Sequence, residues 1–175
     1  NLATIDEDAT NNNGSLVSSL IAGFITDVDA GAIQGIAVVG MIATNGKWQY
    51  SIDGGANWTD FLAVSDASAV LLAATAQDRV RFLPNTQNGG GGSLTIRAWD
   101  RSNALSNGTT GVDVSVNGAA APYSVTTAST SITTTDVNDA PSITGVANLA
   151  TIDEDATNNN GSLVSALIAG FVTDV

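Results

Sequence analysis

Carboxylate and amide side chains gather at a few places in the sequence, and their types suit a hard metal ion. Asp136, Asn138 and Asp139 lie within four residues, and the acidic run 153–155 follows about 14 residues later. Like charges at this spacing repel one another, and folding brings them closer still. A divalent cation reverses the sign of that interaction, and calcium accepts six to eight oxygen ligands. The sequence therefore predicts either a calcium (Ca2+) site or a solvated acidic surface that only aids solubility.

The composition excludes several classes of chemistry. The 175-residue chain carries 17 acidic and 5 basic residues, for a formal charge of −12, and has no Cys and no His. It therefore has no disulfide framework, no Cys/His zinc site and no Cys or Ser–His–Asp nucleophile. So acidic a chain is not drawn to nucleic acid or an anionic membrane. No apolar run approaches the ~20 residues that insert across a membrane. We expect a structural role and not an enzyme.

The sequence also repeats itself. Residues 148–175 match residues 1–28 at 26 of 28 positions, with a constant offset of 147. This self-similarity indicates an excerpt from a tandem array, with one unit and the opening of the next. Pro141 lacks an N–H and restricts Ala140 to extended conformations, so a boundary is expected near residue 140. We predict a complete repeat over 1–140, a linker at 136–141 (DVNDAP), and an incomplete second repeat over 141–175.

The strands are predicted from the pattern of apolar residues. Apolar and polar residues alternate over 47–52, 79–82, 94–99 and 112–117, which indicates half-buried strands. The segment 35–43 is more uniformly apolar and predicts a strand buried on both faces. The glycines at 89–92 are interpreted as a hairpin tip, and a short helical turn is expected within 15–24. Together these signals predict an all-β fold, an antiparallel β-sandwich.

The linker sequence resembles a known family. Asp136-Val137-Asn138-Asp139-Ala140-Pro141 is similar to the calcium linker of cadherins and of cadherin-like repeats in giant bacterial RTX adhesins, which are exported by type I secretion. The resemblance implies an Ig-like or cadherin-like sandwich in a tandem array. Two features depart from the family: the unit exceeds its usual length of roughly 100 residues, and Ala140 stands where a further Asn is usual. The implied calcium ligands are Glu7, Asp27, Asp29, Asp100, Asp136, Asn138, Asp139, Glu154 and Asp174.

The resemblance also implies a mechanical function. Without calcium the linker would be a flexible joint of repelling carboxylates, and calcium would fix the angle between adjacent repeats of the same chain. Two sets of ligands are expected. The first joins the linker to Glu154 and Asp174, and the second joins a preceding linker to Glu7, Asp27, Asp29 and Asp100. The chain would then be an extender on the bacterial cell surface, outside the cell, that spaces a terminal binding domain for adhesion or biofilm formation.

Two other functions remain open from the sequence. The chain can be a subunit of an extracellular filament or matrix, in which the opening strand of one copy completes the sheet of a neighbouring copy. It can also be a carbohydrate-binding module, if Arg79, Arg81 and Arg97 face outward with Trp99 as a basic and aromatic patch. The segment 51–58 fits the pattern S-x-D-x-G-x-x-W and resembles the Asp-box of sialidases, which is a structural hairpin turn and not a catalytic motif.

Overall fold

A computed structural model describes residues 1–27 and 34–175. The chain divides into two units, Asn1–Val137 (unit 1) and Asn138–Val175 (unit 2), and each is described by itself. Strands dominate the described residues, and the all-β prediction is confirmed. None of the helices among these residues is long and apolar enough to cross a membrane.

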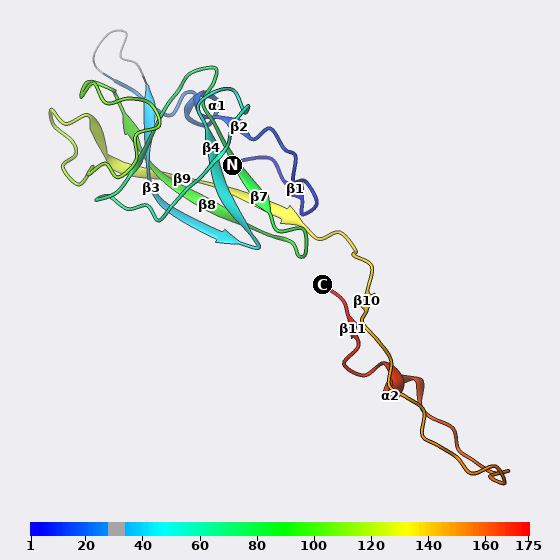
Figure 1. Cartoon of the computed structure of the whole chain (residues 1–175). Helices are drawn as coiled ribbons and strands as arrows, with labels where there is room; N and C mark the ends of the chain where they lie inside the picture. Colours follow the sequence, from blue (N-terminus) through cyan, green and yellow to red (C-terminus); the bar gives the residue numbers. More distant parts are fainter. Residues whose placement is uncertain (28–33) are drawn as a thin grey trace. The chain divides into compact units, whose positions relative to one another are not determined.

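Unit 1 contains two sheets in a sandwich-like arrangement (Figure 1). The five-stranded sheet has the order β1 (Ile5–Asp6), β9 (Tyr123–Thr135), β8 (Gly90–Trp99), β3 (Gly35–Thr44) and β6 (Val70–Ala73). The four-stranded sheet has the order β2 (Ser15–Leu16), β7 (Arg79–Pro84), β4 (Gly46–Ser51) and β5 (Thr59–Asp60). Neighbouring strands are antiparallel except β1 and β9, which are parallel. The predicted strands over 47–52, 79–82 and 94–99 are confirmed as β4, β7 and β8.

The main core lies between the two sheets. The short helix α1 (Val17–Ile21), within the predicted 15–24 segment, adds Val17 and Ile21 to this core. Trp48 on β4 meets Phe82 on β7 edge to face, with ring centroids 5.4 Å apart. The buried side chains contributed by the five-stranded sheet are Ile36, Val38, Val70, Leu72, Leu94, Ile96 and Ile132. Burial of aromatic and branched side chains on this scale is the main favourable term for folding.

A second, smaller core covers the outer face of the five-stranded sheet. Residues 100–122 cross that face, and Val114 packs with Leu71 and Trp99 beneath them. The alternation over 112–117 predicted a strand, and that prediction is wrong: only the single bridge Ala69↔Val112 forms there. The segment covers the outer face of the five-stranded sheet, and its backbone forms hydrogen bonds with separate parts of the chain.

The glycines at 89–92 do not form a hairpin tip. Gly90, Gly91 and Gly92 lie inside β8, between β3 and β9. A Cβ on Gly92 would collide with the carbonyl oxygen of Ile42, so the absence of a side chain lets the strands approach here.

Unit 2 repeats the short helix of the first 28 residues but not their strands. It contains the pair β10 (Ser142–Ile143) and β11 (Val172–Thr173), and the helix α2 (Val164–Ile168). The helices α1 and α2 occupy equivalent positions, since Val17 and Val164 are 147 residues apart. Their burial differs: Val17 is 0% exposed and Val164 is 69% exposed.

Candidate functional site

The acidic opening of unit 1 lies beside the strand that leads into the linker. β1 pairs in parallel with the end of β9, with Ile5 opposite Thr134 and Asp6 opposite Thr135. The Glu7 N–H continues this ladder and donates to the Thr135 carbonyl (3.1 Å). As a result the Glu7 carboxylate reaches the first linker residues, and its Oε1 accepts a hydrogen bond from the Val137 N–H (2.8 Å).

Glu7 is buried with half of its carboxylate unsatisfied. The residue is 1% exposed, and Oε2 is buried without a hydrogen-bond partner among the described residues. An ionised carboxylate is costly to bury unless it is paired, so such an oxygen favours a bound cation. Asp139, two residues beyond Val137 in the chain, also has a buried oxygen, Oδ2, without a partner.

The neighbouring acids are held by turns. Asp6 Oδ1 accepts a hydrogen bond from the Thr135 hydroxyl (2.6 Å), and Asp136 Oδ1 accepts one from the Gly89 N–H. A Cβ on Gly89 would lie 2.7 Å from that same Oδ1, so glycine permits the approach. Asn45 secures the turn through its side-chain amide, which donates to the Gly89 carbonyl (2.8 Å). Sequence patterns did not predict a supporting role for Gly89 and Asn45, although both lie in the turn signals between strands.

The donor types fit calcium. All the side chains concerned offer oxygen, which calcium prefers, and Glu7 Oε2 is an orphaned donor atom. In the described part of the chain, no group of three or more Asp and Glu side chains lies close enough to hold a metal. Calcium also accepts oxygen ligands from Asn side chains and backbone carbonyls.

Glu7 does not lie with Asp27 and Asp100, and the expectation that they share one site is wrong. Asp100 follows Trp99, which pairs with Gly35 at the start of β3, whereas the Glu7 end of the sheet lies beyond Thr44 at the end of β3. β3 has 10 residues, so the two ends are about 30 Å apart at ~3.3 Å per residue. The reason is topological, because β1 runs parallel to β9 and delivers Glu7 to the end where β9 finishes.

Asp27 lies near the Asp100 end. It follows Ile25 by two residues, and the Ile25 carbonyl accepts a hydrogen bond from the side chain of Gln34, next to β3 (3.5 Å). Asp100 itself caps a turn, with Oδ1 accepting from the Ser102 N–H (2.8 Å). Asp29 lies outside the described residues.

In unit 2 the predicted ligands also separate. Asp174 follows Thr173, which pairs with Ser142, so Asp174 lies near the linker end of this unit. Glu154 is exposed in a turn closed by the Ala156 N–H and the Asp153 carbonyl (3.1 Å), and this turn lies at the opposite end of the unit from β10 (Figure 1). The expected grouping of Glu154 with Asn138 and Asp139 is therefore wrong.

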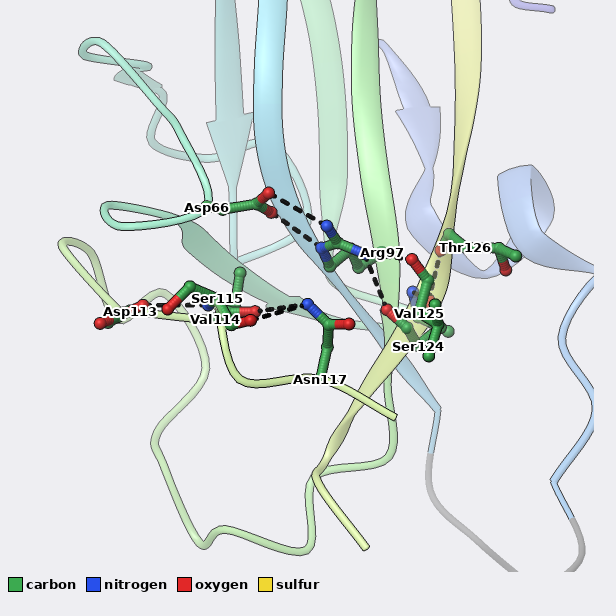
Figure 2. A network of polar contacts seen from close by, with 10 residues as sticks. Asp66, Arg97, Asp113, Val114, Ser115, Asn117, Ser124, Val125 and Thr126 are labelled. Carbon is green, nitrogen blue, oxygen red and sulfur yellow. Dashed lines mark hydrogen bonds and ion pairs between the residues drawn. The ribbon is translucent and has the colours of Figure 1, made fainter. Parts of the chain in front are cut away.

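The four predicted residues do not form one exposed basic and aromatic patch, because Arg79 and Arg81 lie on β7 in the four-stranded sheet and Arg97 and Trp99 lie on β8 in the other sheet. Trp99 is 1% exposed and Arg97 is 9% exposed, because residues 100–122 cover the outer face of β8. Arg97 makes a two-pronged ion pair with Asp66 (2.8 and 3.0 Å) and donates to the carbonyls of Ser124 and Val125 (Figure 2). The hydrogen bonds from Arg97 hold the pKa of Asp66 below its ordinary value. Arg97 is thus a structural clamp.

The Asp-box resemblance describes a structural turn here as well. Asp53 Oδ1 accepts hydrogen bonds from the Asn57 N–H (2.9 Å) and the Ser51 hydroxyl (2.7 Å), while Gly54 and Gly55 adopt positive φ angles of 80° and 96°. The two Asn57 hydrogen bonds, followed by that of Ser51, lower the pKa of Asp53 to about 2. These hydrogen bonds close the turn and engage both oxygens of the Asp53 carboxylate.

No protein-family model matches the chain, and neither the curated proteins nor the solved structures contain a match to it. The class that the fold defines is an all-β, sandwich-like unit whose opening segment recurs 147 residues later.

Proposed function

We propose that the chain is a calcium-rigidified structural extender repeat of a large extracellular bacterial adhesin. The supporting observation is the buried carboxylate of Glu7, which has one oxygen on the Val137 N–H and the other without a partner among the described residues. A cation at that oxygen would be held against the backbone that enters the linker. Its binding would therefore order the linker, and in an array it would stiffen the path from one repeat to the next.

The position of Glu7 revises the ligand sets. We infer that Glu7 and Asp136 are ligands at the start of the linker that follows them in the chain, while Asn138 and Asp139 remain ligands that the resemblance to cadherin-like linkers implies. Asp27 and Asp100 lie at the other end of the repeat, the end that a preceding linker would enter. Binding to the ordered state alone also raises stability by mass action. Extracellular calcium modules bind at roughly 10⁻⁴ to 10⁻³ M, which suits a protein outside the cell.

Small-angle scattering of an array with two complete repeats, titrated from EGTA into millimolar calcium, tests the proposal. We expect the maximum dimension to rise toward that of a stiff rod, and the combined substitutions Asp136→Ala and Asp139→Ala to abolish the rise. Asp113→Ala, which removes an exposed acid away from the linker, is the matched control and should leave the rise intact. A maximum dimension that calcium does not change would rule out the extender mechanism.

A second candidate is a filament or matrix subunit that assembles by strand exchange. The observation in its favour is the exposure of apolar side chains in residues 148–175, such as Val164 at 69%, whose counterpart Val17 is 0% exposed in unit 1. A neighbouring copy can supply the missing cover by strand addition. The molar mass in solution, with and without calcium, tests it: polymers would support the filament, and a single-chain mass in both conditions would refute it.

A further inference from the structure

Unit 1 carries a groove of about 700 Å³ between the end of α1 and the β8–β9 part of the five-stranded sheet. The largest exposed side chain in the groove is Phe24, which is 84% exposed. The apolar lining residues are Leu20, Ile21, Phe24, Ile25, Ile96, Ala98 and Ala128. Such a groove, with a phenylalanine open to solvent, is an unusual feature in an isolated domain.

One wall of the groove is an open strand edge. β9 pairs with β8 along one side, but on the other side β1 pairs only with Thr134 and Thr135. In the described part of the chain no strand pairs with that side of residues 124–129. This stretch reads SVTTAS, with no charged residue and no proline to discourage pairing. The edge is therefore suited to accept another strand.

The register of β1 and β9 indicates which residues would meet this edge. Ile5 lies opposite Thr134, a pairing offset of 129. The Leu2 N–H donates to the Ser131 carbonyl (2.9 Å), and in a parallel ladder this hydrogen bond corresponds to a pairing offset of 130. Continued backwards, these two offsets place the six residues ahead of Asn1 beside residues 124–130. In the repeat, the six residues ahead of the equivalent Asn148 are 142–147, with the sequence SITGVA.

Unit 2 shows residues 142–147 docked on the counterpart of the other groove wall. Ser142 and Ile143 pair with Thr173 and Val172, and the Thr144 N–H donates to the Phe171 carbonyl (2.9 Å). The Ala147 N–H likewise donates to the carbonyl of Leu167 (2.7 Å). At the offset of 147, the partners of these residues correspond to four that line the groove in unit 1: Leu20, Phe24, Ile25 and Thr26.

The docked segment explains the difference between the two phenylalanines. Phe171 is only half-buried, yet it is better covered than Phe24, although unit 2 contains far fewer residues. Gly145 lies directly against its ring, where a Cβ would be 3.2 Å from the Phe171 Cδ1. In turn, Ile143 and Val146 are 61% and 62% exposed in unit 2. On the β8–β9 wall of unit 1, Ile96, Ala98 and Ala128 offer apolar contacts of the kind they lack.

We propose that the groove of unit 1 binds a second copy of residues 142–147, entering directly ahead of Asn1 as the last part of a preceding linker. This strand would pair with residues 25–26 on one side and with the open edge of β9 on the other. Each linker would then end in the first strand of the next repeat, so that strand pairing joins the repeats independently of calcium. The proposal does not rest on the calcium site.

The test places a second copy of residues 138–147 directly ahead of Asn1 in the full chain and measures amide hydrogen exchange in EGTA. Exchange at residues 20–26 and 124–129 should slow at least tenfold relative to the original chain. The matched control carries the same extension with its Ile143→Asp and Val146→Asp changes only in the added copy, and it should give no protection. Equal protection by both extensions, or protection by neither, would overturn the proposal.

A second measurement avoids any effect of the extension on folding. A synthetic peptide with the sequence of residues 138–147, added to the unmodified chain, should shift the NMR signals of Phe24 and of residues 124–129. The peptide with the two Asp substitutions should not shift them. Because both experiments are done in EGTA, a negative result would leave the calcium proposal standing, and a failed calcium titration would leave this one standing.

Discussion

Glu7→Gln should largely abolish the gain in stability that calcium gives the protein. At 10 mM calcium, a site with a dissociation constant of 10⁻³ to 10⁻⁴ M stabilises the folded state by about 1.4–2.7 kcal/mol. For a domain the size of unit 1, this free energy raises Tm by on the order of 5–10 °C. The substitution removes the charge but retains the oxygen that accepts from the Val137 N–H, so the gain from calcium should fall below about 0.5 kcal/mol.

The same substitution should have the opposite effect without calcium. In EGTA the wild-type protein buries a carboxylate oxygen of Glu7 that has no partner in residues 1–27 and 34–175, and this residue is 1% exposed. A neutral amide with an unpaired group costs less than an unpaired charge, so Gln should raise stability by about 1 kcal/mol. The variant should therefore be more stable than the wild type in EGTA and less stable than the wild type in calcium.

The repeat provides the matched control. Glu154 occupies the same sequence context as Glu7, but it is exposed. Differential scanning calorimetry of the full chain, with Glu7→Gln and Glu154→Gln measured in both buffers, makes the comparison. Glu154→Gln should behave as wild type in each. If Glu7→Gln lowered Tm equally in EGTA and calcium, the carboxylate would be a structural acceptor only, and the reasoning would be refuted.

Three further substitutions test the framework around the site. Asn57→Ala removes the side-chain hydrogen bond to Asp53 but keeps the one from the backbone N–H, so it should raise the pKa of that carboxyl part of the way from about 2 toward its ordinary value; an NMR titration would show it. Because this pKa is depressed in the folded state, the turn is stabilised above the ordinary pKa of Asp and loses that stability as pH falls toward 2. Asn107→Ala breaks its bonds to the Ala73 N–H and to the fully buried Asp78. It should cost about 2–4 kcal/mol in urea unfolding, and an unchanged midpoint would contradict this. Arg97→Lys keeps the charge but loses the fork geometry, and should cost about 1–2 kcal/mol by the same assay.

The local apolar pattern correctly predicted strands that pair with another strand on each side. Alternation marked β4 and β7 because one face of each packs on Trp48, Phe82 and the rest of the main core. The same alternation failed over 112–117, where Val114 is buried and Val116 is 78% exposed without forming a strand. Alternation of apolar and polar residues shows only that one face of a segment is covered. The segment becomes a strand only if a neighbouring strand has a free edge to pair with it.

The outer face of β8 could not be assigned from its own sequence. Arg97 and Trp99 have the spacing of outward-facing residues, and they do face away from the main core. They are buried because a long connection without regular strands, residues 100–122, folds over them. The long strand β9 gave no local signal, because most of its residues are Thr and Ser and only a few are buried.

The residue types predicted the chemistry of the candidate site, but they could not predict which of the residues lie together. Acidic residues near the linker suggested oxygen ligation from composition alone. Which of them share one end of the sheet depends on strand direction, and the parallel pairing of β1 with β9 brings Glu7 to Val137. An antiparallel pairing would have sent Glu7 toward Asp100. No local pattern encodes that choice, since it depends on contacts between residues about 130 positions apart.

The two copies of the opening segment separate local from tertiary causes. Helices α1 and α2 have the same length, and the residues preceding them, Leu16 and Leu163, have nearly identical backbone angles (φ −65°, ψ 135° and 134°). The turn of helix is thus specified by its own sequence, although a five-residue helix is marginal in water without packing. Packing differs sharply, as Val17 at 0% and Val164 at 69% exposure show. A segment that adopts its conformation before its core is complete can meet the strand 142–147 early. In an array, the end of each linker would then start the folding of the repeat that follows it.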